Sequence, residues 1–498
     1  MFKYLDFQKL NSILQYDQYD PLYFTTILFF FLFLIVVAVY RLLSPYKNIR
    51  VAFLILFSAY FYYKAAGNFL TILFGTAIIN YLLGLGLNKL SGIKRKLFFI
   101  FGLLFNIGLL GYFKYTNFFL QNISSLFEYN YGGLNIILPI GISFYVFKSI
   151  SYLIEINLEN IEPEKNILNF ILYITFFANV LAGPIDRANY FLENTKEKYF
   201  LTKQQIGTAV FLIVLGLLKK VVIADYIGLN FVDRVFDAPE RFTGVENLIA
   251  VYGYTLQIYC DFSGYSDMAI GLALLLGFRL MQNFNSPYKA TSVADFWRRW
   301  HISLSSWLLD YLFKPMQIKF RNLRIYGNAL ALTITFLICG LWHGANWTFI
   351  FWGGLHAFYM VVGLFLKRPK EKLYKKLSLS NTWILKAAQI FITFHLIAFA
   401  WIFFRVKNFD YARVMLEQIF SNFQSEVFPQ FVSGFVIVFV LIVLGYLVHF
   451  LPEKIEFFIK DIIVKIPLPA KAFILAAGIW IAAQFKFADL QPFLYFQF

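Results

Sequence analysis

Long apolar stretches recur along almost the whole length of this 498-residue chain. A helix needs ~20 mostly apolar residues to cross the ~30 Å hydrocarbon layer of a membrane. Many stretches approach that length, and short polar or basic segments separate them. The sequence therefore predicts an all-α integral membrane protein. The expected spans are residues 22–43, 50–63, 69–87, 97–113, 136–156, 167–181, 206–223, 245–259, 329–341, 347–366, 385–404, 431–451 and 470–485.

The composition agrees with this prediction. Hydrophobic residues make up 60% of the chain and charged residues 14%, whereas soluble globular proteins carry about 25% charged residues. No linker rich in Gly, Pro or Ser divides the chain, so a single membrane domain over residues 1–498 is expected. Residues 1–20 lack the basic start and the small-residue cleavage site of a signal peptide. They are expected to form an interfacial N-terminal segment that is retained.

Basic residues outnumber acidic residues by 44 to 28. They lie in short clusters between apolar stretches, so the expected partner is the lipid membrane and not nucleic acid. The clusters at 89–96 and 367–376 are predicted to face the cytoplasm, because cytoplasmic loops are enriched in Lys and Arg. The two cysteines, Cys260 and Cys339, lack the spacing of metal ligands, so neither a disulfide nor a metal site is expected.

Two segments in the middle of the chain are too short or too interrupted to be simple spans. They are residues 264–277 and the polar, aromatic and basic residues 285–324. Irregular backbone survives at membrane depth only where it packs against protein or lines a water-filled cavity. The middle third is therefore predicted to form re-entrant or tilted helices around a funnel.

A helix is predicted through residues 297–308, and it would place His301 on a packed face. Histidine is the side chain best suited to moving protons near neutral pH, and it is costly to bury in hydrocarbon without a purpose. Taken alone, the neighbouring tryptophan and arginines are typical of an interfacial helix anchored at lipid headgroups. The residues that share the packed face by the 3,4 spacing are Trp297, Trp300, His301, Leu304 and Leu308.

His343 follows an apolar run and precedes Gly344, and two interpretations of it stay open. It is either a hydrogen-bonded structural residue or a proton handler. Burial depresses the pKa of an imidazole, which keeps it neutral and able to accept a proton at pH 7. Gly344 would let a substrate approach the backbone closely. Cys339 would adjoin His343 on a helix, although a buried cysteine is usually a small hydrophobe.

The remaining histidines, His356, His395 and His449, are expected to be packing residues with satisfied hydrogen bonds. Asp261 and Asp267 stand at the start of the interrupted segment. An acid dyad is one interpretation of this pair, and N-capping of a helix by Asp261 or Ser263 is the more ordinary one.

Six short motifs are distributed along the chain: LPIGISFY (138–145), AGPI (182–185), YCDFSGYSD (259–267), DFWRRWHISLS (295–305), GLWHGA (340–345) and PFLYFQF (492–498). In this order they resemble the membrane-bound O-acyltransferase (MBOAT) superfamily, in its bacterial branch that includes the alginate O-acetylation membrane subunit. The resemblance extends over nearly the whole chain, which makes it specific.

The resemblance implies a bundle of about 11 transmembrane helices plus re-entrant helices around a central tunnel. Through that tunnel an acyl group would pass from a cytoplasmic thioester to a hydroxyl on the outer side. The resemblance also implies that His343 is the near-invariant catalytic histidine, that His301 is a second functional histidine, and that residues 259–360 form the catalytic segment. The expected substrate-binding residues are Trp297, Trp300, Asp261, Ser263, Trp342 and Asn346.

The chain departs from its relatives after the fourth motif. They usually have Arg where Leu309 stands and a Gly-Gly-Asn-Arg-like turn in place of residues 314–320. The loop nevertheless stays basic, which suits the phosphates of acetyl-coenzyme A or of a phosphopantetheine arm. No bound cofactor is expected beyond this acyl thioester co-substrate. The residues expected to hold it are Arg298, Arg299, Lys314 and Lys319.

The expected function is transfer of an acyl group, by resemblance an acetyl group, to an exported polysaccharide or envelope glycan. An extracytoplasmic partner protein is expected to receive the group in some members and to modify the polymer. D-alanyl transfer to teichoic acid from an acyl-carrier protein is an alternative with the same chemistry. The alternative from another class is a transporter with His301 and His343 as a proton relay. The expected location is the inner (cytoplasmic) membrane of the cell.

Overall fold

The computed structural model describes residues 14–17, 19–129, 131–380, 382–485 and 493. The predicted interfacial segment at 1–20 and the last motif, 492–498, lie mostly outside the described residues. The regular structure of the described chain is helical, without a strand, as predicted. The chain divides into two compact units. The first comprises residues up to 217 together with 265–281 and the chain from 459 onward, and the second comprises 218–264 and 282–458.

The described residues include six helical stretches that are long and apolar enough to cross a membrane, and a bent pair would make a seventh. The protein is therefore a multi-pass membrane protein, as its apolar stretches predicted. The number of about 11 spans and the extent of a single domain over 1–498 stay predictions. The stretches are Lys47–Lys89, Gly92–Leu126, Lys203–Asp237, Arg321–His343, Trp347–Lys376 and Trp383–Arg405, with the pair Val427–Gly434 and Val436–Phe450 bent by 94°.

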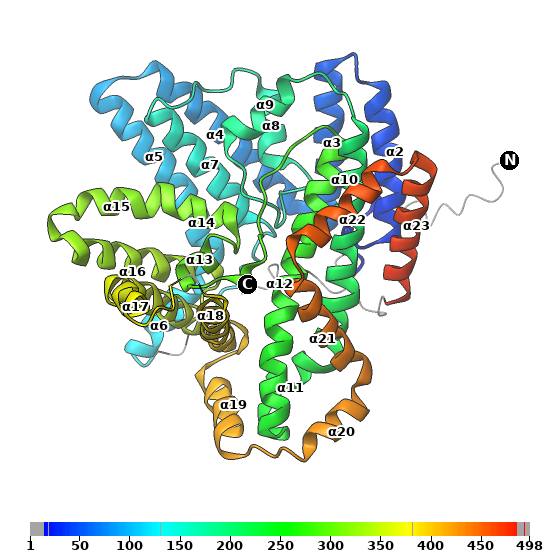
Figure 1. Ribbon diagram of the computed structural model, residues 1–498. Coiled ribbons are helices and arrows are strands. Elements are labelled where there is room, and N and C mark those ends of the chain that lie inside the picture. The colour runs from blue at the N-terminus through cyan, green and yellow to red at the C-terminus, as the bar shows by residue number, and fades with distance from the viewer. Residues whose placement is uncertain (1–13, 18, 130, 381, 486–492, 494–498) are drawn as a thin grey trace. The chain divides into compact units, whose positions relative to one another are not determined.

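In the first unit, α4, α5, α7 and α8 pack into a bundle (Figure 1). Asn80 of α4 and Asn106 of α5 exchange two amide hydrogen bonds of 3.1 and 2.7 Å. Such side-chain bonds hold apolar helices together where the hydrophobic effect does not distinguish helix from lipid. The helices of this unit are α2 (Ile27–Leu42), α3 (Lys47–Ala66), α4 (Leu70–Lys89), α5 (Gly92–Leu110), α6 (Thr116–Leu126), α7 (Ile142–Asn157), α8 (Ile167–Thr175), α9 (Ala188–Lys196), α10 (Lys203–Leu217) and α23 (Leu468–Gln484).

A buried charge network lies around the loop that carries the AGPI motif. Lys148 of α7 donates to the carbonyl oxygen of Tyr173 at 3.0 Å and to Oδ1 of Asn179 at 2.6 Å. The amide of Asn179 in turn donates to Asp186 at 2.8 Å. A buried charge is tolerated only when paired and hydrogen-bonded. This network therefore fixes the loop against α7 and α8 inside the first unit.

The second unit carries most of the predicted catalytic segment. Its helices are α11 (Asp233–Asp237), the first part of α12 (Gly244–Leu275), α13 (Val293–Trp297), α14 (Ile302–Leu308), α15 (Lys314–Lys319), α16 (Arg324–His343), α17 (Trp347–Lys376), α18 (Trp383–Arg405), α19 (Phe409–Ser421), α20 (Val427–Gly434) and α21 (Val436–Phe450). Helix α22 (Glu453–Lys465) and α12 each pass from one unit to the other.

Residues 264–277 do not form the separate, interrupted segment that the sequence predicts. Helix α12 continues without a break for 32 residues, through both the expected span at 245–259 and the segment that follows it. Its small residues serve close packing instead of ending the helix. At Gly271, for example, a Cβ atom would lie 2.9 Å from the carbonyl oxygen of Ala209 on α10.

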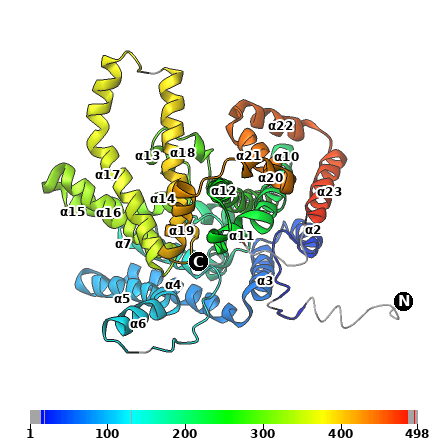
Figure 2. The same ribbon diagram turned by 90° about the horizontal axis from the view of Figure 1, so that it is seen from below.

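Two glycines let α16 and α17 approach each other closely. A Cβ at Gly340 would collide with the carbonyl oxygen of Phe349, and one at Gly353 would collide with that of Phe336. Small residues at such crossings allow backbone contact between membrane helices. Helix α17 also packs along α18, as Figure 2 shows. The glycine contact therefore determines where α16 places its last residue, His343.

Substituting alanine at Gly353 is expected to destabilise this helix pair by about 1–3 kcal/mol, since the new methyl group meets rigid backbone. The adjacent Gly354 provides a matched control, because a Cβ there would meet only the Leu337 side chain at an ordinary 3.8 Å. Gly354→Ala should be neutral or stabilising, as alanine is the better helix former. Thermal unfolding of both variants in detergent measures the difference. Equal unfolding temperatures would contradict the packing argument.

Candidate active site

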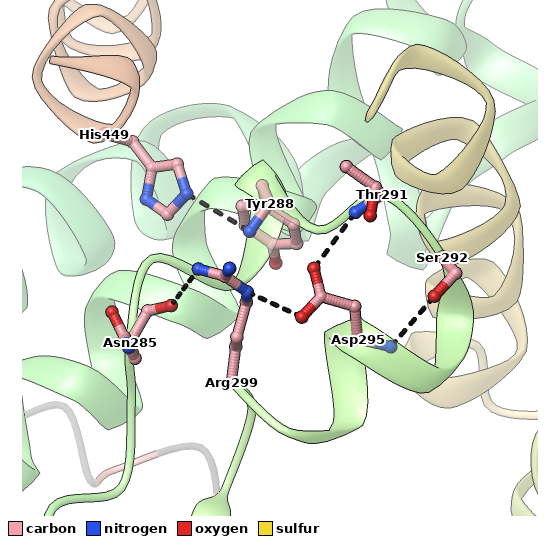
Figure 3. Close-up of polar contacts among 7 residues, drawn as sticks. All are labelled: Asn285, Tyr288, Thr291, Ser292, Asp295, Arg299 and His449. Atoms are coloured by element: carbon pink, nitrogen blue, oxygen red, sulfur yellow. Dashed lines mark hydrogen bonds and ion pairs between the residues drawn. The ribbon is translucent and has the colours of Figure 1, made fainter. Parts of the chain in front are cut away.

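The segment before His301 is held by a network of hydrogen bonds and one ion pair (Figure 3). Ser292 caps α13 by accepting the backbone N–H of Asp295 at 3.1 Å. The Asp295 carboxylate accepts the backbone N–H of Thr291 at 3.2 Å and pairs with Nε of Arg299 at 3.0 Å. Arg299 also donates to the carbonyl oxygen of Asn285 at 3.4 Å. Arg299 therefore takes part in holding the motif together.

The single helix predicted through residues 297–308 is wrong. Helix α13 ends at Trp297 and α14 begins at Ile302, with His301 between them in the left-handed region at φ 43° and ψ 54°. Asn283 explains the break, since its carbonyl oxygen accepts the backbone N–H of Ile302 at 2.9 Å and its Oδ1 accepts the Ser303 hydroxyl at 2.7 Å. Non-glycine residues rarely adopt this conformation, and they cluster at functional sites.

His301 is completely buried in the second unit. The ring of Phe262 from α12 lies edge-on to it, with ring centroids 4.7 Å apart. Burial lowers the pKa of His301 to about 3, because taking the imidazolium out of water is unfavourable. His301 is therefore neutral at physiological pH and can donate one hydrogen bond while accepting another.

His343 is the last residue of α16 and is buried among aromatic rings. Its ring lies edge-on to Trp352 of α17 at 5.1 Å and to Phe404 of α18 at 5.2 Å between centroids. The ring of Trp342 packs against both histidines, with its centroid 4.9 Å from that of His343 and 6.2 Å from that of His301. The structure thus brings the two predicted histidines to the same tryptophan, His343 from the end of α16 and His301 from the link between α13 and α14.

The other three histidines pack as predicted. His356 and His449 are buried and His395 is half-buried, and at least one ring nitrogen of each makes a hydrogen bond. The bonds join His356 to the indole N–H of Trp297 at 3.1 Å, His395 to the hydroxyl of Tyr252 at 3.0 Å, and His449 to the backbone N–H of Tyr288 at 3.2 Å (Figure 3).

The predicted tryptophans Trp297 and Trp300 are both buried in the aromatic core of the second unit. The ring centroid of Trp297 lies 5.8 Å from that of Trp352, and the ring centroid of Trp300 lies 5.0 Å from that of Trp401 on α18. Asn346 caps α17, since its side chain accepts the backbone N–H of Thr348 at 3.0 Å. These side chains support the helices around His343, and their contact with substrate stays a prediction.

The basic residues predicted to hold the donor do not form one cluster with the histidines. Arg298 and Lys319 are exposed, and Lys314 pairs with Asp310 at 2.8 Å on the surface. Leu309 begins a π-helical turn that ends at Phe313. π-helical turns often occur at functional sites.

Asp261 does not cap a helix, because it lies in the interior of α12. It accepts a hydrogen bond from Lys220 at 2.5 Å, and Asp225 accepts another from the same ammonium at 2.6 Å. Lys220 and Asp225 belong to a π-helical stretch, Leu218–Asp225. Sequence reasoning missed both, although three charges at the end of an apolar run, Lys219 included, were a visible signal. Ser263 is buried two residues after Asp261, and its hydroxyl bonds to no other described residue.

Gly344 does not leave space for a substrate beside its Cα. A Cβ atom there would collide with the ring of Phe349, so the expectation of a close substrate approach is wrong. The missing side chain instead lets Phe349 pack directly after His343. Cys339 is buried as a free thiol on the same helix as His343.

Comparison with known proteins decides the family. A model of MBOAT, the membrane-bound O-acyltransferase family, matches residues 114–406, which is more than half of the chain. The chain belongs to the membrane-bound O-acyltransferase family. This range includes His301, Trp342 and His343, so the site described above lies inside the region that defines the MBOAT family. The protein is an acyltransferase.

Three relatives show which MBOAT enzymes the chain is similar to. The peptidoglycan O-acetyltransferase of Helicobacter pylori is 35% identical over 440 residues, 82% of this chain and 81% of that protein. A probable alginate O-acetylase of Azotobacter vinelandii is 35% identical over 412 residues, 80% of this chain and 78% of that protein. The teichoic acid D-alanyltransferase of Bacillus subtilis is 31% identical over 287 residues, 56% of this chain and 71% of that protein.

Proposed function

We propose that this MBOAT protein lies in the inner membrane and moves an acetyl group from a cytoplasmic thioester to a hydroxyl on the outer side. The acceptor is an exported polysaccharide or envelope glycan, or an extracytoplasmic partner protein that modifies the polymer. The contact of His301 and His343 with the same buried Trp342 carries the proposal, because it joins two imidazoles in one water-poor site. The 35% identity to O-acetyltransferases of peptidoglycan and alginate supports the choice of acetyl and of a glycan.

His343 is the proposed general base. Its neutral imidazole accepts the proton of the acceptor hydroxyl while the hydroxyl oxygen attacks the thioester carbonyl carbon. The tetrahedral intermediate then collapses, the carbon–sulfur bond breaks, and the thiolate leaves and takes up a proton. His343 returns to its neutral form by releasing its proton. A positioned base of this kind contributes ~10²–10⁴ in rate.

His301 is the proposed group that orients the reactants and stabilises the developing oxyanion. Burial keeps it neutral, so it acts through an N–H hydrogen bond. The proposed tunnel is enclosed by about 11 transmembrane helices and excludes the bulk water that would hydrolyse the donor. We place Trp297, Trp300, Trp342, Asp261, Ser263 and Asn346 among its substrate-binding residues.

Arg298 and Arg299, which follow α13, and Lys314 and Lys319 of α15 are proposed to bind the phosphates of the donor. The double variant Lys314→Ala/Lys319→Ala is then expected to raise the KM for acetyl-coenzyme A roughly tenfold while kcat changes little, because phosphate contacts bind ground state and transition state alike. Lys370→Ala/Lys372→Ala removes the same charge elsewhere and serves as the control. An unchanged KM in the first variant, or an equal rise in both, would contradict this donor site.

D-alanyl transfer is a second candidate, because the Bacillus subtilis relative is a teichoic acid D-alanyltransferase. The two candidates differ in donor. Turnover of acetyl-coenzyme A by the purified protein supports acetyl transfer, whereas turnover only with a D-alanyl carrier protein supports the alternative.

The cellular test compares envelope glycans from cells that produce the wild-type protein with those from cells that produce His343→Ala. Mass spectrometry should find O-acetyl groups on a polysaccharide or glycan only with the wild-type protein. Identical glycans in both strains would refute the proposed acceptor.

A further inference from the structure

A cavity of about 690 Å³ lies in the second unit where α17 ends and α18 begins. Figure 2 shows these two helices running side by side to their connection. Lys375 of α17 and Lys386 of α18 line the cavity from opposite sides of that connection, together with Trp383. Thr291, which precedes the capped helix α13, also lines it.

The residues directly after α17 and directly before α18 form regular helix ends. Ser378 follows α17 in the left-handed region at φ 55°. Its backbone N–H donates to the carbonyl oxygen of Lys375 at 3.1 Å. The backbone N–H of Leu379 donates to the carbonyl oxygen of Tyr374 at 3.0 Å. This pair of bonds is the Schellman motif. Thr382 then caps α18 by accepting the backbone N–H of Leu385 at 3.2 Å, so both helix ends that carry the lysines are held in place.

The charge of the cavity is net positive. The charged side chains among the lining residues are two lysines, Lys375 and Lys386, and one carboxylate, Glu371. Neither lysine makes an ion pair with another residue in the described part of the chain. Four further lysines lie in the last ten residues of α17, but they do not line the cavity. Two ammonium groups without a protein partner at one cavity make an anion-binding site.

The composition of the two helices indicates that the cavity lies near the level of the lipid headgroups. Helices α17 and α18 are both long and apolar enough to span a membrane, and the cavity is at the shared end of the two. Trp383 is 78% exposed there, and exposed tryptophan next to lysine is typical of the membrane interface. Phe404, which contacts His343, lies about 30 Å further along α18, so this cavity is separate from the candidate active site.

We propose that this cavity binds a phosphate ester, and its depth favours the phosphodiester of an anionic phospholipid headgroup over a soluble phosphate. The two lysines pair with the phosphate oxygens, and Trp383 packs on the glycerol backbone at the interface. The bound headgroup would contact Thr291, whose backbone N–H is bonded to Asp295. This inference concerns binding alone and is independent of the proposed acyl transfer.

The test titrates the detergent-purified full chain with phosphatidylglycerol, with phosphatidylcholine and with coenzyme A, and counts bound molecules by native mass spectrometry. Lys375→Gln/Lys386→Gln is compared with Lys370→Gln/Lys372→Gln, which removes equal charge from the same helix end without touching the lining. Thermal unfolding verifies that both variants remain folded.

Retention of phosphatidylglycerol by wild type and control, with affinity weakened roughly tenfold or more in the lining variant, supports the lipid source. The same pattern with coenzyme A alone supports the phosphate site with a soluble source. Two outcomes would overturn the proposal. One is equal binding of phosphatidylglycerol and phosphatidylcholine without binding of coenzyme A. The other is an equal loss of affinity in both variants.

Discussion

His343→Ala is expected to reduce acetyl transfer by ~10²–10⁴, which is below detection in most assays, while the protein stays folded in detergent. The substitution removes the only proposed base, and the hydroxyl nucleophile is too weak an acid to ionise alone near neutral pH. His343→Gln, which keeps hydrogen-bonding capacity, should be equally inactive. Radiolabelled acetyl transfer by the purified variants measures the effect, and size-exclusion chromatography with thermal unfolding verifies the fold.

His395→Gln is the matched control for this experiment. His395 is also on a helix of the second unit, α18, but it bonds to Tyr252 and has no contact with Trp342 among the described residues. It should retain most of the activity. A purified His343→Ala protein that retains most of its activity would refute the catalytic role, and a loss that is equal in His395→Gln would show that the assay reports damage to the fold.

Lys220→Met is expected to destabilise the protein by about 3–5 kcal/mol, since it leaves the buried carboxylate of Asp261 and the partly buried carboxylate of Asp225 without their shared cation. The Lys220 side chain is 1% exposed and lies between Asp225 and Asp261. The change should also lower activity, because Asp261 precedes Phe262, whose ring packs on His301. Unfolding by heat or denaturant in detergent, followed by the transfer assay, measures both effects.

Two comparisons isolate the buried pair. Lys314→Met breaks the exposed ion pair with Asp310, whose side chains are 55% and 39% exposed, and it should change stability by less than about 1 kcal/mol. The variant Lys220→Met/Asp225→Asn/Asp261→Asn removes all three charges and should recover much of the lost stability, since neutral groups are easier to bury. A triple variant no more stable than Lys220→Met would contradict the charge argument.

The aromatic and glycine-rich motifs illustrate how far the sequence could predict the site. The sequence indicates His343 and His301 as candidate catalytic residues because histidine is unusual in an apolar segment, and the family motifs distinguish these two from the other three histidines. His356 was expected to pack, and its bond to Trp297 agrees. The sequence predicts space for a substrate beside Gly344, because nothing in it shows that Phe349 of the next helix lies against this glycine.

Charge partners were harder to predict than histidines. Asp261 was recognised as unusual, but Lys220 and Asp225 lie about 40 residues earlier, and only the packing of a π-helical stretch on α12 joins them. Pairing at such a separation depends on helix crossing, which periodicity in one segment does not encode. The same holds for Trp342, whose contact with both histidines requires α16 and the link between α13 and α14 to meet.

The sequence by itself determined that this protein is helical, lies in a membrane and carries the motifs of an acyltransferase, because apolar length and local motifs are properties of single segments. Only the tertiary structure decided where the helices break and which polar side chains meet. Asn283 holds the break between α13 and α14 at His301, and Lys220 joins two distant carboxylates. Each of these outcomes depends on a partner from another segment, since a buried polar group takes whichever hydrogen-bonding partner the packing brings near.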